Sequence, residues 1–235
     1  YIAEGNYHQA LMIVKPWRRQ AKAAANQSEH HAAANRLAQI LWKQSRYVSC
    51  RTALDFIERE FRSSEISLLI DSYALRGELQ RRTGKIKEAQ VSCRQAVDFA
   101  ETAGDLPRLA HSLNNLGLAC WTGGNLDEAS QCFEKCLNLH EAKNSRYLGA
   151  RIANNLAIIS EERGDYIRAR DLANRALGAF AEFGDRRNQS YASGNLANLL
   201  VHAGRIRQAT ELFTTADRIF LHLGETHPHF YTVGN

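Results

Sequence analysis

The chain has 235 residues, of which 44% are hydrophobic and 9% aromatic, and it carries a formal net charge of +5. This composition is sufficient for a continuous core and differs from that of disordered or low-complexity segments. No run of about 18 apolar residues occurs, which excludes a transmembrane helix. All of the excess positive charge lies in residues 1–62, which hold ten Lys and Arg against five Asp and Glu.

The five cysteines form neither a Cys-x-x-Cys pair nor a regular framework, which indicates a reducing, cytoplasmic compartment. Cys132 and Cys136 lie four residues apart. This spacing is compatible with a metal-binding or redox pair, and also with two small side chains buried on one helix face. Other copies of the repeat described below have Ala or aromatic residues at the cysteine positions, which favours burial. Because the histidines lack partners at ligand spacing, we expect no metal and no cofactor.

A self-similar block recurs with a period of forty residues, and each copy predicts two amphipathic helices. The chain is therefore expected to be a single all-α array over residues 1–235. It begins with a half repeat at 1–25, in which Pro16 should kink or break the helix near Lys15. Five repeats (26–64, 65–104, 105–144, 145–184 and 185–224) and the start of a further repeat (225–235) follow. The expected helix pairs are 27–43 with 47–61, 66–82 with 86–102, 106–122 with 126–142, 146–162 with 166–182, and 186–202 with 206–222.

Short polar and glycine-rich breaks separate these helices. Asn26 with Glu29 is typical of a helix start. A glycine stands in the turn inside four repeats, where a left-handed residue can end the first helix (Gly84, Gly124, Gly164 and Gly204). Twenty residues after each glycine, Gly or Asn ends the second helix, and Asp, Ser or Glu begins the next one (Gly104-Asp105, Asn144-Ser145, Gly184-Asp185 and Gly224-Glu225).

The clearest copy of the block carries Asn115-Leu116-Gly117, then Gly124, Ala129 and Phe133. This pattern resembles the tetratricopeptide repeat, and Ala169 with Ala176 and Ala209 with Ala216 restore its paired alanines in later copies. The forty-residue period is similar to that of LGN/Pins-type adaptors, kinesin light chains and the C-terminal arrays of signal-transduction ATPases. Residues 224–228 (Gly-Glu-Thr-His-Pro) resemble the joint between repeats of kinesin light chains. The resemblance implies a right-handed superhelix of antiparallel helix pairs, in which the first helix of each pair lines a concave groove.

In such a groove, asparagines that recur once per repeat would form a ladder whose rungs lie about 10 Å apart, close to the rise of three extended residues. A side-chain amide can both donate to and accept from a peptide backbone. Alternatively, the same asparagines connect each first helix to the neighbouring repeat. The resemblance places the following candidate partner-binding residues in the groove: Asn114, Asn115, Arg151, Asn154, Asn155, Tyr191, Asn195 and Asn198.

Three functions are compared. The first is an interaction module that binds an extended peptide or partner segment, which can be another domain of the same parent protein. The second is a sensor segment of a larger signal-transduction ATPase or transcription regulator, which binds a small ligand or a neighbouring domain. The third, an enzyme, is disfavoured because no Gly-x-Ser-x-Gly, His-Glu-x-x-His or dinucleotide motif occurs.

The basic cluster Trp17-Arg18-Arg19 with Lys22 has three interpretations: a contact with nucleic acid, a contact with an acidic partner, or an ordinary solvated helix face. The solvated face is favoured, since no nucleic-acid motif accompanies the charge. Aromatic side chains such as Trp17 and Trp42 at an open end of the array could also contact a second copy and form a dimer.

Overall fold

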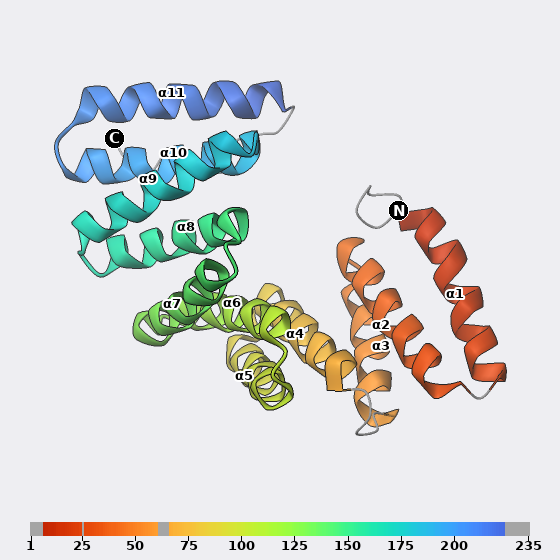
Figure 1. Cartoon of the computed structure of the whole chain (residues 1–235). Helices are drawn as coiled ribbons and strands as arrows, with labels where there is room; N and C mark the ends of the chain where they lie inside the picture. The colour runs from red at the N-terminus through yellow and green to blue at the C-terminus, as the bar shows by residue number, and fades with distance from the viewer. Residues whose placement is uncertain (1–6, 25, 61–65, 224–235) are drawn as a thin grey trace. The chain divides into compact units, whose positions relative to one another are not determined.

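The computed structural model of the chain describes residues 7–24, 26–60 and 66–223 (Figure 1). These residues form eleven α-helices and no strand. The helices are α1 (Tyr7–Ala23), α2 (Gln27–Lys43), α3 (Tyr47–Glu60), α4 (Ile66–Arg82), α5 (Ile86–Ala103), α6 (Leu106–Thr122), α7 (Leu126–Ala142), α8 (Arg146–Glu162), α9 (Tyr166–Glu182), α10 (Arg186–His202) and α11 (Ile206–His222). From α2 to α11, every helix begins and ends within one residue of the expected position, and the all-α fold is confirmed.

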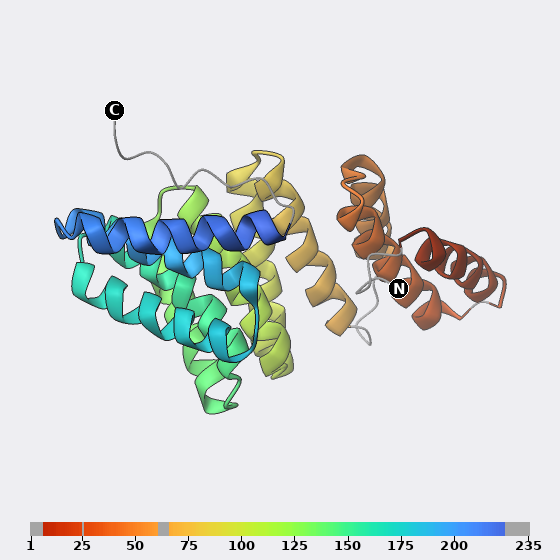
Figure 2. The same ribbon diagram turned by 90° about the horizontal axis from the view of Figure 1, so that it is seen from above.

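The chain divides into two compact units, Tyr1–Asn125 and Leu126–Asn235. The N-terminal unit contains α1 to α6, and the C-terminal unit contains α7 to α11. Within each unit, consecutive helices pack on one another, and α10 and α11 lie antiparallel in both views (Figures 1 and 2). The expected repeat boundaries and the single array remain predictions, and the segments 1–6 and 224–235 lie outside the described residues.

The turns have the backbone conformation that the glycines predicted. Gly84, Gly124, Gly164 and Gly204 have φ between +70° and +80°, which a residue with a Cβ rarely adopts. Asn144 has φ +53° at a break between repeats, and Ser45 has φ +57° in the turn between α2 and α3. These left-handed residues end the helices and allow the chain to reverse within a few residues.

Several helices begin with the expected side-chain caps. The Asn26 carboxamide oxygen accepts a hydrogen bond from the Glu29 N–H at 3.2 Å. The carboxylates of Asp105 and Asp185 accept from the N–H groups three residues later, at 3.1 and 3.0 Å. Ser145 precedes α8 without such a bond. Each capping bond satisfies an N–H that the first turn of the helix leaves without an internal partner.

We expected a kink or a break near Lys15, and the break does not occur, because α1 continues through Pro16 without interruption. Proline lacks the N–H that would bond the carbonyl four residues earlier, which belongs to Met12. Met12 and Pro16 are both exposed, so water can reach the freed carbonyl. The cost of the proline is therefore small enough for the helix to remain intact.

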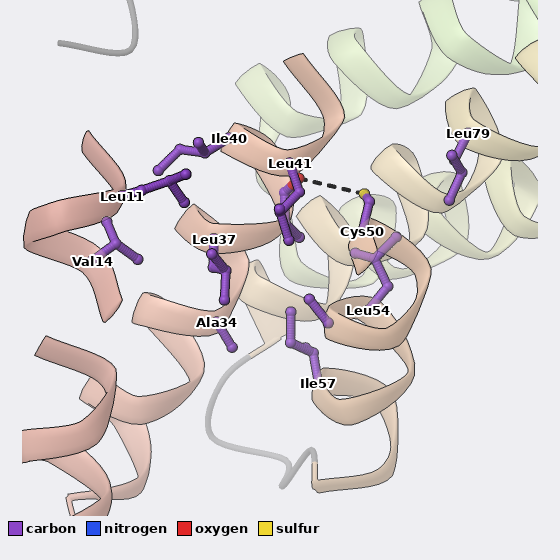
Figure 3. Packing of buried hydrophobic residues seen from close by; sticks show 12 residues of the cluster. Leu11, Val14, Ala34, Leu37, Ile40, Leu41, Cys50, Leu54, Ile57 and Leu79 are labelled. Carbon is purple, nitrogen blue, oxygen red and sulfur yellow. Dashed lines mark hydrogen bonds between the residues drawn. The ribbon is translucent and has the colours of Figure 1, made fainter. Parts of the chain in front are cut away.

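One core cluster of the N-terminal unit, rich in leucine and isoleucine, joins α2 to α1 and to α3. Figure 3 shows Leu11 and Val14 of α1 pointing toward the α2 side chains that include Leu37 and Ile40. Cys50 of α3 is buried in this cluster, where its Sγ donates to the Ala38 carbonyl at 3.4 Å. All five cysteines are buried, as their repeat positions indicated, and none forms a disulfide.

The core of the C-terminal unit is built mainly from alanines. Ala153 of α8, Ala176 of α9 and Ala192 of α10 are fully buried in one cluster. Small side chains let helix backbones approach closely, so each helix can contact its neighbours on two sides. None of the helices in the described ranges has the length and apolar character needed to cross a membrane.

Candidate partner-binding faces

The first helices of two repeats in the C-terminal unit carry matching stripes of accessible residues. On α8 the stripe is Arg151, Asn155, Ile158 and Glu162, and on α10 it is Tyr191, Asn195, Asn198 and His202. The spacings of four, three and four residues place each stripe on one side of its helix. All eight residues are half-buried or exposed. α8 and α10 contact each other, and Asn195 and His202 of the α10 stripe lie against Asn154 and Glu161, the neighbours of two α8 stripe residues. We call the two stripes together the α8–α10 face.

The asparagines of this face connect the two helices. Asn195 Nδ2 donates to Asn154 Oδ1 at 3.0 Å, and the two residues are 41 positions apart. The sequence left two roles open for the asparagines, binding a partner or connecting neighbouring repeats. This bond is a connection between repeats. The amide of Asn198 has no hydrogen-bond partner within the described part of the chain and is half-buried. Asn154 and Asn195 therefore support the fold, whereas Asn198 has its amide available.

Tyr191 and Arg151 occupy the first row of the face. The ring of Tyr191 packs edge-on against Phe220 of α11, with ring centroids 5.2 Å apart. Arg151 is exposed and forms no ion pair in the described part of its unit. Its charge acts at longer range on His140, where burial first, and then Arg151 and Lys143, lower the pKa of the imidazole. A neutral His140 therefore adds no charge to this end of the face near pH 7.

A hydrogen-bonded cluster holds a carboxylate near Arg151. The Asp185 carboxylate accepts from Tyr147 Oη at 2.5 Å and from Asn188 Nδ2 at 2.7 Å. Burial opposes ionisation of Asp185, but these bonds and the charge of Arg151 outweigh burial and lower its pKa. The Gly184-Asp185 break predicted this residue as a helix cap. Its bond to Tyr147, 38 residues earlier, could not be read from local sequence.

Two neighbouring carboxylates lie at the other end of the face. Glu161 is mostly buried and lies 3.4 Å from Nε2 of His202. Burial raises the pKa of Glu161, the charge of His202 lowers it, and the nearby Glu162 raises it further. The His202 ring also packs on Tyr166, with centroids 5.7 Å apart. Sequence reasoning missed His202, because the spacing of residues along α10 does not show that its side chain lies against Glu161 of α8.

The corresponding asparagines of the N-terminal unit are more deeply buried. Asn115 on α6 is only 7% exposed, and its Nδ2 donates to the carbonyl of Ala74 on α4 at 3.3 Å. The Asn114 amide in turn donates to Asn115 Oδ1 at 3.5 Å. Asn35 of α2 similarly donates to the Leu68 carbonyl at 3.3 Å. In this unit, Asn115 acts first as a link between helices.

One side chain of the basic cluster of α1, that of Arg18, packs against another helix. The guanidinium of Arg18 lies 4.8 Å from the ring centroid of Phe56, within the range of a cation–π interaction. Arg19 and Lys22 are exposed. No group of three or more metal-binding side chains is assembled in the described ranges.

Comparisons with known proteins agree with this repeat architecture. A family profile described as tetratricopeptide repeat matches residues 68–142 and 150–220. A search of curated proteins finds no match. Among solved structures, BtubC (BKLC) from P. vanneervenii has a TM-score of 0.78 at 21% identity, and the match covers 99% of this chain and 96% of that one.

Two further structures share the fold. A putative kinesin light chain with TPR-like repeats from Podospora anserina has a TM-score of 0.66 at 17% identity, covering 83% of this chain and 97% of that one. A Signal Transduction ATPase with Numerous Domains from Pyrococcus horikoshii, which has a tetratricopeptide repeat sensor, has a TM-score of 0.73 at 14% identity. That match covers 96% of this chain and 38% of that one. The profile covers more than half of the sequence, and its matches fall on successive helix pairs, so the chain belongs to the tetratricopeptide repeat family.

Proposed function

We propose that the chain is a protein-interaction module that binds an extended segment of a partner protein on its first-helix faces. The observation that carries this proposal is the α8–α10 face, where an unpaired guanidinium at Arg151 and an unpaired amide at Asn198 lie among accessible polar residues. Within residues 126–223, no hydrogen bond or ion pair of the structure uses these two polar groups. A partner with main-chain amides and a carboxylate would satisfy them.

The proposed asparagine ladder has two roles. Asn195 uses its Nδ2 to hold Asn154, so it offers a partner its carbonyl oxygen. Asn198 can both donate and accept. Together with Asn155, Tyr191 and Arg151, these residues form the proposed contact surface of the C-terminal unit. In the N-terminal unit we propose Asn114 as the contacting amide and Asn115 mainly as its support.

A sensor role within a larger signalling protein is the second candidate. It is supported by the likeness to the Pyrococcus horikoshii ATPase, whose repeat segment is described as a sensor and whose length exceeds that of this chain. In that case the occupant of the face is a small ligand or a neighbouring domain of the parent protein. Buried cysteines that form no disulfide suit a reducing compartment, and we place the protein in the cytoplasm in either case.

Site-specific photo-crosslinking tests the interaction role. A photoreactive amino acid replaces Asn198 on the face, and in a control variant it replaces the exposed Asn174 on α9. Lysate of the source organism is irradiated with each variant, and adducts are identified by mass spectrometry. We expect protein adducts from position 198 that position 174 does not give. Equal adducts from both positions, or no protein adduct from position 198, would contradict the proposal.

A further inference from the structure

The α8–α10 face has opposite charges at its two ends and uncharged side chains between them. Arg151 stands in the first row of the face and Glu162 in the last. Eleven residues separate them along α8, which corresponds to about 16 Å at a rise of 1.5 Å per residue. The charges are therefore too far apart to neutralise each other and can act on different groups of a bound partner.

The cationic end keeps its charge near neutral pH. Arg151 is exposed, and the exposed Lys143 lies close enough to act on the same histidine. The Asp185 carboxylate, whose pKa is lowered, accepts hydrogen bonds from Tyr147 and Asn188 and forms no ion pair with Arg151 among the described residues. Arg151 and Lys143 are thus two cations near the Asp185 carboxylate, which already accepts two side-chain hydrogen bonds. The Arg151 end of the face therefore carries a net positive charge.

The acidic end has the opposite balance. Glu161 and Glu162 are adjacent, and burial, followed by the charge of Glu162, raises the pKa of Glu161. His202 lies against Glu161, with its Nε2 3.4 Å from the carboxylate, so it can offset at most one of the two carboxylate charges. The nearby Arg163 is engaged by Asp127 at 3.0 Å. This end therefore carries a net negative charge.

The middle of the face suits a peptide backbone. Asn195 and Asn198 present amide groups there, and Ile158 of α8 offers a half-buried apolar surface. An extended chain that crosses α8 and α10 through this row would place its N–H and C=O groups near the amides. Successive side chains of an extended chain point to opposite sides. One set would then point toward Arg151 and the other toward Glu162.

From this arrangement we infer that the α8–α10 face selects extended segments in which acidic and basic residues alternate, with the acidic side chains toward Arg151 and the basic ones toward Glu162. This inference rests on the proposed function, since it specifies the partner for the same face. The occupant is a dipolar peptide segment. A partner with a single kind of charge would gain at one end of the face and lose at the other.

A peptide-display library tests the inference. Random 12-residue peptides are selected on the purified chain, and the affinity of the best peptides is measured by fluorescence polarisation. We expect selected sequences to carry Asp or Glu next to Lys or Arg. Arg151→Glu or Glu162→Lys should each weaken their binding about tenfold or more, because each places like charges together.

A charge exchange provides the sharper control. A second peptide is made in which the acidic and basic residues are exchanged. The double variant Arg151→Glu/Glu162→Lys should bind this second peptide at least as well as it binds the original peptide. On α9, Arg170→Glu/Asp171→Arg exchanges an exposed ion pair and should leave binding unchanged. Circular dichroism confirms that all variants are equally helical.

The outcomes separate this inference from the proposed function. Selected peptides that depend on Asn198 and Tyr191 but show no alternation of charge would overturn the inference and leave the interaction role intact. Peptides that respond equally to the α9 exchange would overturn it as well. Failure to select any peptide that contacts the face would count against both.

Discussion

Gly77 is a residue at which one added methyl group would disrupt the packing of two helices. A Cβ there would overlap Sγ of Cys93 on α5 and lie 3.2 Å from the carbonyl oxygen of Ala89. Since a backbone atom cannot move aside as a flexible side chain can, we expect Gly77→Ala to destabilise the protein by about 1–3 kcal/mol. Urea unfolding followed by circular dichroism measures this change.

Two variants establish whether the steric contact is the cause. Gly178 lies in α9 with no atom near its hypothetical Cβ, so Gly178→Ala should raise stability by about 0.5–1 kcal/mol through helix propensity. The double variant Gly77→Ala/Cys93→Ala should recover part of the loss, because the sulfur is removed. A loss at position 77 that is unchanged in the double variant would assign the damage to the Ala89 backbone instead.

At the scale of helices, the sequence predicted boundaries well because local chemistry determines them. The left-handed glycines and the caps at Asp105 and Asp185 act within three or four residues of their own position. The break expected at Pro16 does not occur, because the cost of the proline depends on whether water reaches the freed carbonyl. That property belongs to the folded environment of α1 and is not visible in the residues around the proline.

Ser45 allows a direct test of helix termination. It occupies the left-handed position after α2, with φ +57°, where the later repeats have glycine. A left-handed residue with a Cβ costs about 1–2 kcal/mol, so we expect Ser45→Gly to stabilise the protein by about 1 kcal/mol. Thermal unfolding monitors the change. Gly84→Ala, at φ +78°, should shift the midpoint in the opposite direction, and equal shifts of one sign would contradict this account.

An ion-pair cluster joins α3 to α4. Arg76 of α4 donates to Glu58 Oε1 at 2.6 Å and to Asp55 Oδ1 at 2.7 Å. Burial raises the pKa of Glu58, and Arg76 counteracts that effect. We expect Arg76→Met to cost about 2–3 kcal/mol at pH 7, because it leaves a half-buried carboxylate without its partner.

The same variant has a predictable pH dependence. Without Arg76 the folded-state pKa of Glu58 rises further above its unfolded value, so the folded protein binds this proton more tightly than the unfolded chain. The resulting stability is present below the unfolded pKa and is lost as pH rises through the folded pKa. The deficit relative to the native protein should therefore be smaller at pH 5 than at pH 7. A deficit that is equal at both pH values in urea titrations would show that Glu58 is not responsible.

At the scale of the whole molecule, the site was less predictable than the fold. Register alone placed Asn115 and Asn195 on equivalent helices, but it could not show which amide atoms other repeats use. The structure shows that Asn115 bonds a main-chain carbonyl and Asn195 a side chain. Those partners lie 41 residues away, beyond the reach of local pattern.

The buried thiols report how the two units unfold. Burial raises the pKa of Cys50 to about 11, and that of Cys136 to about 12, so neither thiol should react in the native state near pH 8. Cys50, Cys93 and Cys120 lie in the N-terminal unit, whereas Cys132 and Cys136 lie in the C-terminal unit. Repeat arrays can unfold in parts. We expect iodoacetamide labelling at intermediate urea to separate these two groups, as measured by mass spectrometry.

A single urea midpoint shared by all five thiols would show that the units unfold together. A thiol that reacts fully without denaturant would contradict its burial. Cys50→Ala provides a control for the assignment, because it removes one label from the N-terminal group.

The bonds between repeats also have a mechanical consequence. The connections Asn115 to Ala74 and Asn195 to Asn154 each span 41 residues, and Arg108 to Asp71 spans 37. A tension applied along the chain would act on these connections in series, and they would break one after another. Each rupture would release about one helix pair of chain length while the neighbouring pairs retain their own contacts. The protein should therefore stretch in small, repeated steps and shorten again when the tension is removed.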